Sequence, residues 1–74
     1  MIDLSEIRRI AGVTQVQLAA ALNTSQGQIS RLERQSDMLL STLSAYLTAL
    51  GASATLVIDV NGETLECTLT GEGA

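Results

Sequence analysis

The chain has 74 residues with a net charge of −4, 46% hydrophobic residues and a single aromatic residue, Tyr46. This length allows one small domain, and a core built from aliphatic side chains alone favours self-association as a further source of stability. With one cysteine, Cys67, and no histidine, the composition argues against a disulfide, a metal site or a histidine-activated nucleophile. We therefore expect a cofactor-free cytoplasmic binding protein rather than an enzyme, with neither a signal peptide nor a membrane span.

The charges are divided unevenly along the chain. All four basic residues are arginines in the first half, whereas six of the eight acidic residues lie from Glu33 onward. The two halves differ in sign, which is typical of a chain with two functions. A net negative charge is unusual for a nucleic-acid-binding protein, but local arginines determine the field at a binding surface more than the total charge does.

Three capped helices are predicted in the first half. Each begins with a capping-box pattern, in which a small polar residue is followed three positions later by Glu or Gln: residues 3–6, 14–17 and 25–28. Gly12 suits the left-handed residue that ends the first helix. Apolar residues recur at helical spacing and share one face of each helix: Leu4, Ile7, Ile10 and Ala11; Val16, Leu18, Ala19 and Leu22; Ile29 and Leu32. Of these, Ala19, Leu22, Ile29 and Leu32 are expected in the core.

A fourth helix is predicted from the spacing of Leu43, Leu47 and Leu50. Ser41 or Thr42 is its expected N-cap, and Gly51 is expected to end it. Tyr46 should lie at the edge of the core or in a dimer contact.

The pattern then changes to a β-hairpin. Two alternating runs flank Asn61-Gly62, the strongest short signal for a two-residue hairpin turn. One face is nearly all apolar, so Cys67 is expected to be a buried, unreactive thiol. A lone hairpin is barely stable in water, so it should pack on the helices, pair with another hairpin, or both. Residues 71–74 are expected to fray. The turn pairs Val60 with Glu63, Ile58 with Leu65, Leu56 with Cys67, and Ala54 with Leu69.

The second and third helices are joined by Leu22-Asn23-Thr24 alone, and asparagine tolerates the positive φ that such a turn needs. Two short helices joined this way form a helix-turn-helix. Through IRRIAGVTQVQLAAALNTSQGQISRLER, residues 4–50 resemble the Cro/repressor (XRE-type) family. Two departures are Asn23, where the family usually has glycine, and Gln35, where a glycine commonly follows the glutamate. The resemblance implies a mainly α domain of four to five helices, followed here by a C-terminal hairpin that dimerises.

The next segment, STLSAYLTALGASATLVIDV, resembles the C-terminal part of antitoxin-type members of the HigA and HipB kind. In the HipB kind a strand pairs across the dimer. The resemblance implies a homodimeric repressor that is the antitoxin of a type II toxin–antitoxin pair, represses its own operon and neutralises a toxin. Residues 1–51 would then bind DNA and residues 52–70 dimerise. One alternative is a stand-alone or phage-type repressor. The other is a protein-interaction module that has lost DNA binding, and the net charge of −4 favours this module.

In this family the second helix of the motif enters the major groove with its N-terminal residues, where Gln pairs with adenine and Arg with guanine. Gln15 takes the family's phosphate contact, and Arg8 is either a further phosphate contact, a solvated charge or the partner of an acid. Several residues have a structural alternative, because Ser25 caps the helix, Gln28 can close the capping box, and Gln26 and Arg31 can lie on a solvated face. The residues expected to contact a palindromic double-stranded operator are Gln15, Ser25, Gln26, Gly27, Gln28, Ser30, Arg31, Arg34 and Arg9.

Overall fold

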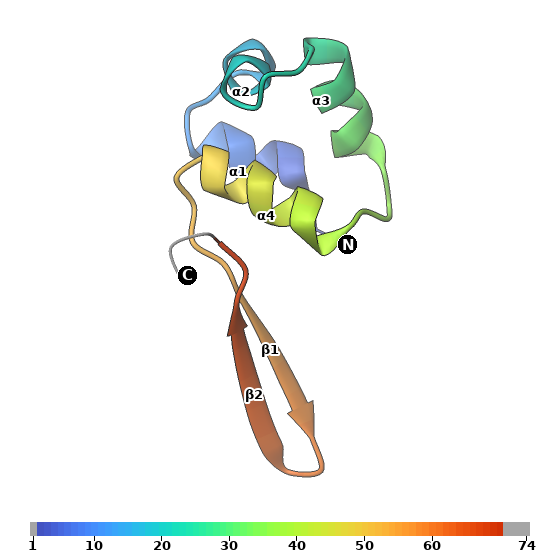
Figure 1. Ribbon diagram of the computed structural model, residues 1–74, viewed down its shortest axis with the longest axis vertical. Helices are drawn as coiled ribbons and strands as arrows, with labels where there is room; N and C mark the ends of the chain where they lie inside the picture. Colours follow the sequence, from blue (N-terminus) through green and yellow to red (C-terminus); the bar gives the residue numbers. More distant parts are fainter. Residues whose placement is uncertain (1, 71–74) are drawn as a thin grey trace.

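The computed structural model describes residues 2–70, and the expected frayed tail at 71–74 lies outside this range. Four helices are followed by one hairpin (Figure 1). The elements are α1 (Leu4–Ile10), α2 (Gln15–Ala21), α3 (Gln26–Arg34), α4 (Leu40–Ala49), β1 (Thr55–Val60) and β2 (Glu63–Thr68). This is the expected mainly α fold with a C-terminal hairpin, in its four-helix form.

The predicted caps hold the first three helices. The side chains of Asp3, Thr14 and Ser25 each accept a hydrogen bond from the backbone N–H three residues on. The reciprocal bond of a capping box is present at Thr14, whose N–H donates to Gln17 Oε1 at 2.9 Å. These bonds satisfy amides that a helix N-terminus would otherwise leave unpaired.

Left-handed residues end three of the helices where the sequence predicted them. Gly12, Asn23 and Gly51 have φ values of 76°, 57° and 72°. At Asn23, the turn of the helix-turn-helix, the Thr24 N–H donates to the Ala19 carbonyl at 2.8 Å. This bond closes the end of α2 and lets α3 begin within a few residues. By contrast, α3 ends at Gln35 with an extended backbone (φ −74°, ψ 144°), so glycine is not needed there.

The core of the helical body (residues 4–49) draws side chains from all four helices. Tyr46 and Leu18 are fully buried, so Tyr46 is a core residue rather than an edge residue. Buried with them are Leu4, Ala19, Ile29, Leu43 and Leu47.

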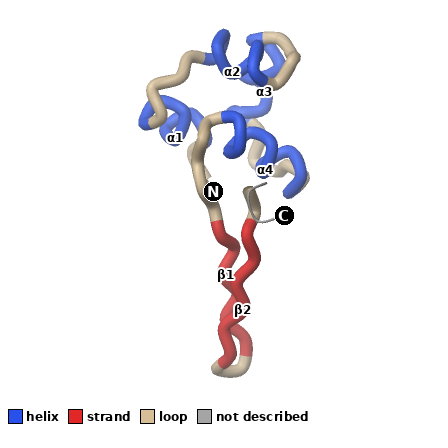
Figure 2. The backbone as a smooth tube through the Cα atoms, turned by 60° about the vertical axis from the view of Figure 1, so that its left-hand side comes forward, coloured by secondary structure: helices blue, strands red, loops and turns tan. Residues whose placement is uncertain are grey.

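The hairpin follows the predicted register, with Val60 opposite Glu63, Ile58 opposite Leu65 and Leu56 opposite Cys67. At its base the Leu69 N–H donates to the Ala54 carbonyl at 2.9 Å, and both residues pack against the helical core. Figures 1 and 2 show the rest of the hairpin projecting away from the helices. Every residue of both strands is exposed, so within one chain the hairpin does not pack on the helical body.

Three further local expectations were wrong. Helix α4 begins two residues early, with Leu39 as N-cap and no side-chain capping bond, so neither Ser41 nor Thr42 caps it. Ile10 and Val16, predicted on the apolar helix faces, are 80% and 60% exposed, and Ala11 is exposed too, because helices of seven residues present only a narrow stripe to the core. Cys67 is exposed because nothing in one chain covers the apolar face of the hairpin.

Candidate nucleic-acid interface

The leading end of α3 is an exposed polar surface. Ser25, Gln26, Gly27 and Gln28 are all exposed, immediately after the turn of the helix-turn-helix. The Ser25 hydroxyl accepts from the Gln28 N–H at 3.2 Å, so its capping role is present. A Cβ added at Gly27 would meet only the Ser25 hydroxyl, at 3.9 Å. Nothing inside the described protein therefore requires glycine at this position.

Gln15 connects the start of α2 to this surface. Its amide nitrogen donates to Glu33 Oε1 at 3.0 Å, and its amide oxygen accepts from the Gln26 side-chain nitrogen at 3.2 Å. Because a carboxylate only accepts hydrogen bonds, the first contact determines which way the Gln15 amide faces. Gln15 then presents its oxygen to Gln26 and orients that side chain at the tip of α3.

Glu33 is the anchor of this chain of contacts. Its carboxylate is 5% exposed and lies 2.7 Å from Arg8 Nε, within a charge-assisted ion pair. The Tyr46 hydroxyl lies 2.6 Å from Glu33 Oε2 and 3.1 Å from the Leu4 carbonyl, and its single hydrogen serves the shorter contact. Arg8 also donates to the Val13 carbonyl at 3.0 Å, which ties the α1–α2 turn to the same cluster.

The pKa values of these groups follow from the same contacts. Burial raises the pKa of Glu33, but hydrogen bonds from Arg8, Tyr46 and Gln15 outweigh it and leave the pKa below its ordinary value of 4.5. The hydrogen bond to Glu33 raises the pKa of Arg8. Burial, together with the neighbouring carboxylate, raises the pKa of Tyr46. Glu33 is therefore ionised and Tyr46 neutral at neutral pH.

The four arginines divide into internal and available groups. Arg8 is committed to Glu33, so of its expected roles the structure supports the partner of an acid. Arg34 donates to the Ser30 hydroxyl at 2.6 Å, which brings these two candidates together on α3. Arg9 and Arg31 are exposed. Arg9, Gln15 and Gln26 line one surface hollow of about 440 Å³ at the start of α2.

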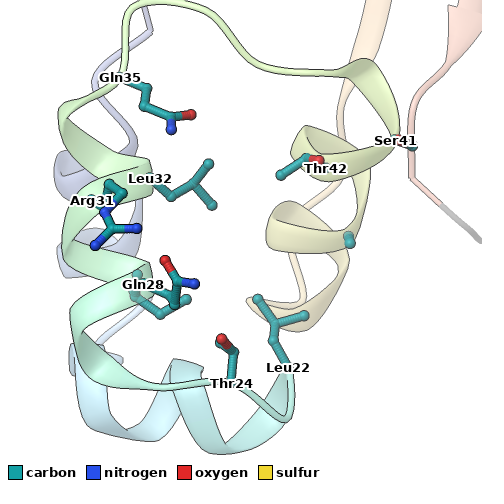
Figure 3. A pocket seen from close by; sticks show the side chains of 10 residues that line it. Leu22, Thr24, Gln28, Arg31, Leu32, Gln35, Ser41 and Thr42 are labelled. Atoms are coloured by element: carbon teal, nitrogen blue, oxygen red, sulfur yellow. The ribbon is translucent and has the colours of Figure 1, made fainter.

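A second hollow of about 430 Å³ lies between α3 and α4 (Figure 3). Leu22, Leu32 and Ala45 give it an apolar floor, and Thr24, Gln28, Arg31, Gln35, Ser41 and Thr42 add polar groups. Figure 3 shows the Gln28 side chain directed into this space, and no bond from it back to the cap appears among the described contacts. Gln28 is thus not used to close a capping box.

The sequence pattern alone does not predict the chain of contacts from Gln26 through Gln15 to Glu33. A signal for its anchor was present, because Glu33 lies four residues after Ile29, and Arg8 four residues after Leu4. Each charge therefore shares a helix face with a buried aliphatic residue, where it needs a partner of opposite sign. The contact between the two glutamines depends on the angle between α2 and α3, which spacing along the chain does not reveal.

Comparison with known proteins identifies the family to which the chain belongs. The family model described as helix-turn-helix matches residues 4–57. The chain belongs to this family. Two solved HigA antitoxins extend the similarity through the hairpin. The helix-turn-helix protein is 35% identical to a HigA antitoxin described for DNA bending induced by its unique dimerization, with a TM-score of 0.77 and coverage of 90% of this chain and 93% of that one. It is 37% identical to a DNA-bound antitoxin, HigA3, with a TM-score of 0.80 and coverage of 92% and 91%.

These similarities make the chain an antitoxin-type member of the Cro/repressor (XRE-type) helix-turn-helix family. No curated protein matches the sequence. Within residues 2–70, no helix has the length and apolar character needed to cross a membrane.

Proposed function

We propose that the protein is a homodimeric, sequence-specific DNA-binding repressor, the antitoxin of a type II toxin–antitoxin module that represses its own operon. The observation that carries this proposal is the exposed leading end of α3, with Gln26 held by Gln15 beside Arg9. One of the similar HigA antitoxins is bound to DNA, and the other is described by its dimerization and by DNA bending. We propose a binding role rather than catalysis, and action in the cytoplasm.

In this proposal α3 enters the major groove, because its first turn is polar, exposed and free of bulky side chains. Gln26 and Arg31 contact base edges, and Gly27 lets the helix approach the DNA closely. Gln28 reaches a base edge only when its side chain turns out of the hollow between α3 and α4. Ser25 caps this helix, Ser30 and Arg34 lie along it, and all three contribute polar and phosphate contacts. Gln15 and Arg9 bind a phosphate beside the groove. Residues 1–51 bind DNA, and residues 52–70 hold the two copies together.

The test is a selection of bound fragments from genomic DNA with the purified protein, repeated with Gln26→Ala/Arg31→Ala. We expect a palindrome with half-sites one helical turn apart, about 34 Å, that is lost in the double variant. A matched control, Ser36→Ala/Asp37→Asn at two exposed positions between α3 and α4, should recover the wild-type palindrome. If the wild-type protein enriches no sequence, the DNA-binding proposal is wrong.

A protein-interaction module without DNA binding remains the second candidate, because the chain carries a net charge of −4. Salt dependence separates the two functions, since neutralised phosphates release counterions and binding weakens as salt rises. A stand-alone repressor would bind the same kind of palindrome but would have no toxin encoded beside it.

A further inference from the structure

The polar side chains around the hollow between α3 and α4 are unpaired, unlike those near the tip of α3. Gln15, Gln26 and Arg34 all bond to other side chains of the protein, at 3.0, 3.2 and 2.6 Å. Within residues 2–70, by contrast, no hydrogen bond or ion pair joins a polar side chain of the hollow to another part of the protein. These side chains belong to Thr24, Gln28, Arg31, Gln35, Ser41 and Thr42. The rim of the hollow is therefore free to bind another molecule.

The floor of the hollow is apolar and only partly covered. Figure 3 shows Leu32 directed into it from α3, Leu22 directed into it from one end, and Thr42 facing them from α4. Leu22 and Leu32 are half-buried, so part of their apolar surface still faces solvent. A volume of about 430 Å³ lies within the range of small-molecule sites, which combine an apolar lining with a few polar groups. The hollow therefore has room for a small ligand with an apolar body.

The charge of the hollow determines the polar end of such a ligand. Arg31 is the only charged residue among the ten that line the hollow, and it has no acidic partner within residues 2–70. The one acid of α3, Glu33, is 5% exposed and bound to Arg8, so it is not available to Arg31. The α4 wall begins at a helix N-terminus without a side-chain cap, whose partial positive charge also favours an anion. One guanidinium balances one carboxylate, because its forked N–H groups can donate to both carboxylate oxygens.

We propose that this hollow binds a small monocarboxylate with an aliphatic body. The carboxylate pairs with Arg31, and the aliphatic chain covers Leu22 and Leu32. The Gln28 amide, which is directed into the same space, can donate a further hydrogen bond to the carboxylate. A surface hollow of this size predicts weak binding, with a dissociation constant on the order of 0.1–1 mM.

Occupation of the hollow would oppose DNA binding. This consequence rests on the proposed function, in which Arg31 contacts a base edge. Its guanidinium cannot pair with a carboxylate and with guanine at the same time. Gln28 must turn out of the hollow to reach DNA, whereas a bound carboxylate holds it inside. The ligand and the operator therefore compete for the same side chains, and the carboxylate acts as an inducer.

The first test titrates the full-length, isotope-labelled protein with octanoate in the absence of DNA and follows NMR chemical shifts. Two matched compounds serve as controls, since octanamide has nearly the same body without the charge, and acetate has the charge without the body. We expect saturable shifts around the hollow with octanoate and binding at least about tenfold weaker for each control compound. Equal affinity for octanamide would refute a carboxylate ligand. Shifts that do not saturate, or that are confined to the apolar face of the hairpin, would refute the site.

Two pairs of variants test the location of the site. Arg31→Gln removes the charge from the hollow, whereas Arg34→Gln removes the other arginine of α3, which lies outside it. Ala45→Leu fills the hollow from α4, and Ala20→Leu adds the same groups at an exposed position of α2. We expect the two hollow variants to weaken octanoate binding roughly tenfold or more and the two controls to leave it unchanged. Circular dichroism verifies that each variant is folded, and octanoate binding that survives both hollow variants would overturn the proposal.

The inducer role is tested by fluorescence anisotropy on the selected operator, with octanoate at about ten times its dissociation constant. The apparent dissociation constant of the operator should then rise at least about tenfold for the wild type and stay unchanged for Ala45→Leu. Sodium acetate at the same concentration keeps the ionic strength equal. Octanoate that occupies the hollow without weakening DNA binding would refute the inducer role. A protein that binds octanoate but no operator would refute the proposed function and leave the ligand site in place.

Discussion

The helical body and the hairpin have opposite relations to solvent. In the helical body, seven hydrophobic residues are buried, including Leu18 and Tyr46 at 0% exposure, and the described buried side-chain polar atoms all have partners. In the hairpin, Ile58, Val60 and Leu65 are 43%, 50% and 55% exposed although the register is regular. The helical body is thus complete within one chain, whereas the hairpin becomes stable only when another surface covers it. Binding to DNA and dimerisation can therefore be broken separately.

The largest effect should come from Glu33 in the helical body. Glu33→Ala removes the ion-pair partner of Arg8, which keeps only the Val13 carbonyl, and the shorter of the two contacts of the Tyr46 hydroxyl. Breaking a largely buried ion pair in this way should cost about 3 kcal/mol. Chemical denaturation followed by circular dichroism measures it. The exposed hairpin acid offers a matched control, since Glu66→Ala should change the free energy of unfolding by less than about 0.5 kcal/mol. Equal effects at both sites would contradict the contrast between the two regions.

A weakening of the dimer should follow from a polar substitution on the apolar hairpin face. Leu65→Ser removes a side chain worth about 1.5–3 kcal/mol when buried, so the dimer dissociation constant should rise at least about tenfold. Sedimentation equilibrium measures the constant, and Thr68→Ser on the opposite face is the control. Unchanged association would mean that the apolar face lies outside the interface.

The pH dependence of stability should also depend on Glu33. Its pKa is lower in the folded chain than in the unfolded one, so the unfolded state binds the proton more readily. The stabilisation is complete above the unfolded pKa, near 4.5, and is lost as the pH falls through the folded pKa. Urea titrations between pH 7 and pH 3 should show a smaller decline for Glu33→Gln than for the wild type. Parallel declines would show that Glu33 does not cause the acid sensitivity.

The phosphate contact expected at Arg9 should appear in the salt dependence of DNA binding. Arg9→Gln should lower the slope of log K against log salt by roughly 0.9 for each phosphate that is no longer neutralised, hence by about 2 for a dimer. Fluorescence anisotropy at several salt concentrations gives the slope, and Arg9→Lys should largely retain it. A slope that is identical in Arg9→Gln would remove Arg9 from the interface.

The smallest expected change concerns Gly27. Gly27→Ala should stabilise the protein by up to about 1 kcal/mol, because glycine is a poor helix former and the added methyl meets only the Ser25 hydroxyl, at 3.9 Å. The same variant should bind DNA more weakly if α3 approaches the bases closely there. Thermal melting and anisotropy on one preparation test both statements. A variant that is more stable and binds with full affinity would leave Gly27 without a role in recognition.

The sequence predicted the local structure well and the tertiary contacts poorly. The caps at Thr14 and Ser25, the turn at Asn23 and the hairpin register all depend on a few neighbouring residues, and all were confirmed. The bond from Gln26 to Gln15 joins residues 11 apart, and the Arg8–Glu33 pair joins residues 25 apart. Both contacts depend on how the helices pack against one another. The sequence shows only that each buried charge needs a partner, not which residue is that partner.

The start of α4 shows the same limit in a different way. Ser41 and Thr42 are good capping residues, but the helix begins at Leu40 with Leu39 as an N-cap that makes no side-chain bond. Packing of Leu43 and Leu47 into the core determines where this helix starts, and tertiary burial outweighs the capping preference. The alternating pattern correctly placed Cys67 on the apolar face of the hairpin. The prediction that its thiol is buried was wrong for a single chain, because no surface of the same chain covers that face.

In the proposed function, the hairpin dimer places two α3 helices on one face of DNA. The most direct test measures affinity for the selected operator and for the same operator with half a helical turn, about five base pairs, inserted between its half-sites. We predict a loss of affinity of at least about a hundredfold, because one dimer can no longer reach both half-sites. Equal affinity for the two operators would show that the copies bind independently and would contradict the account.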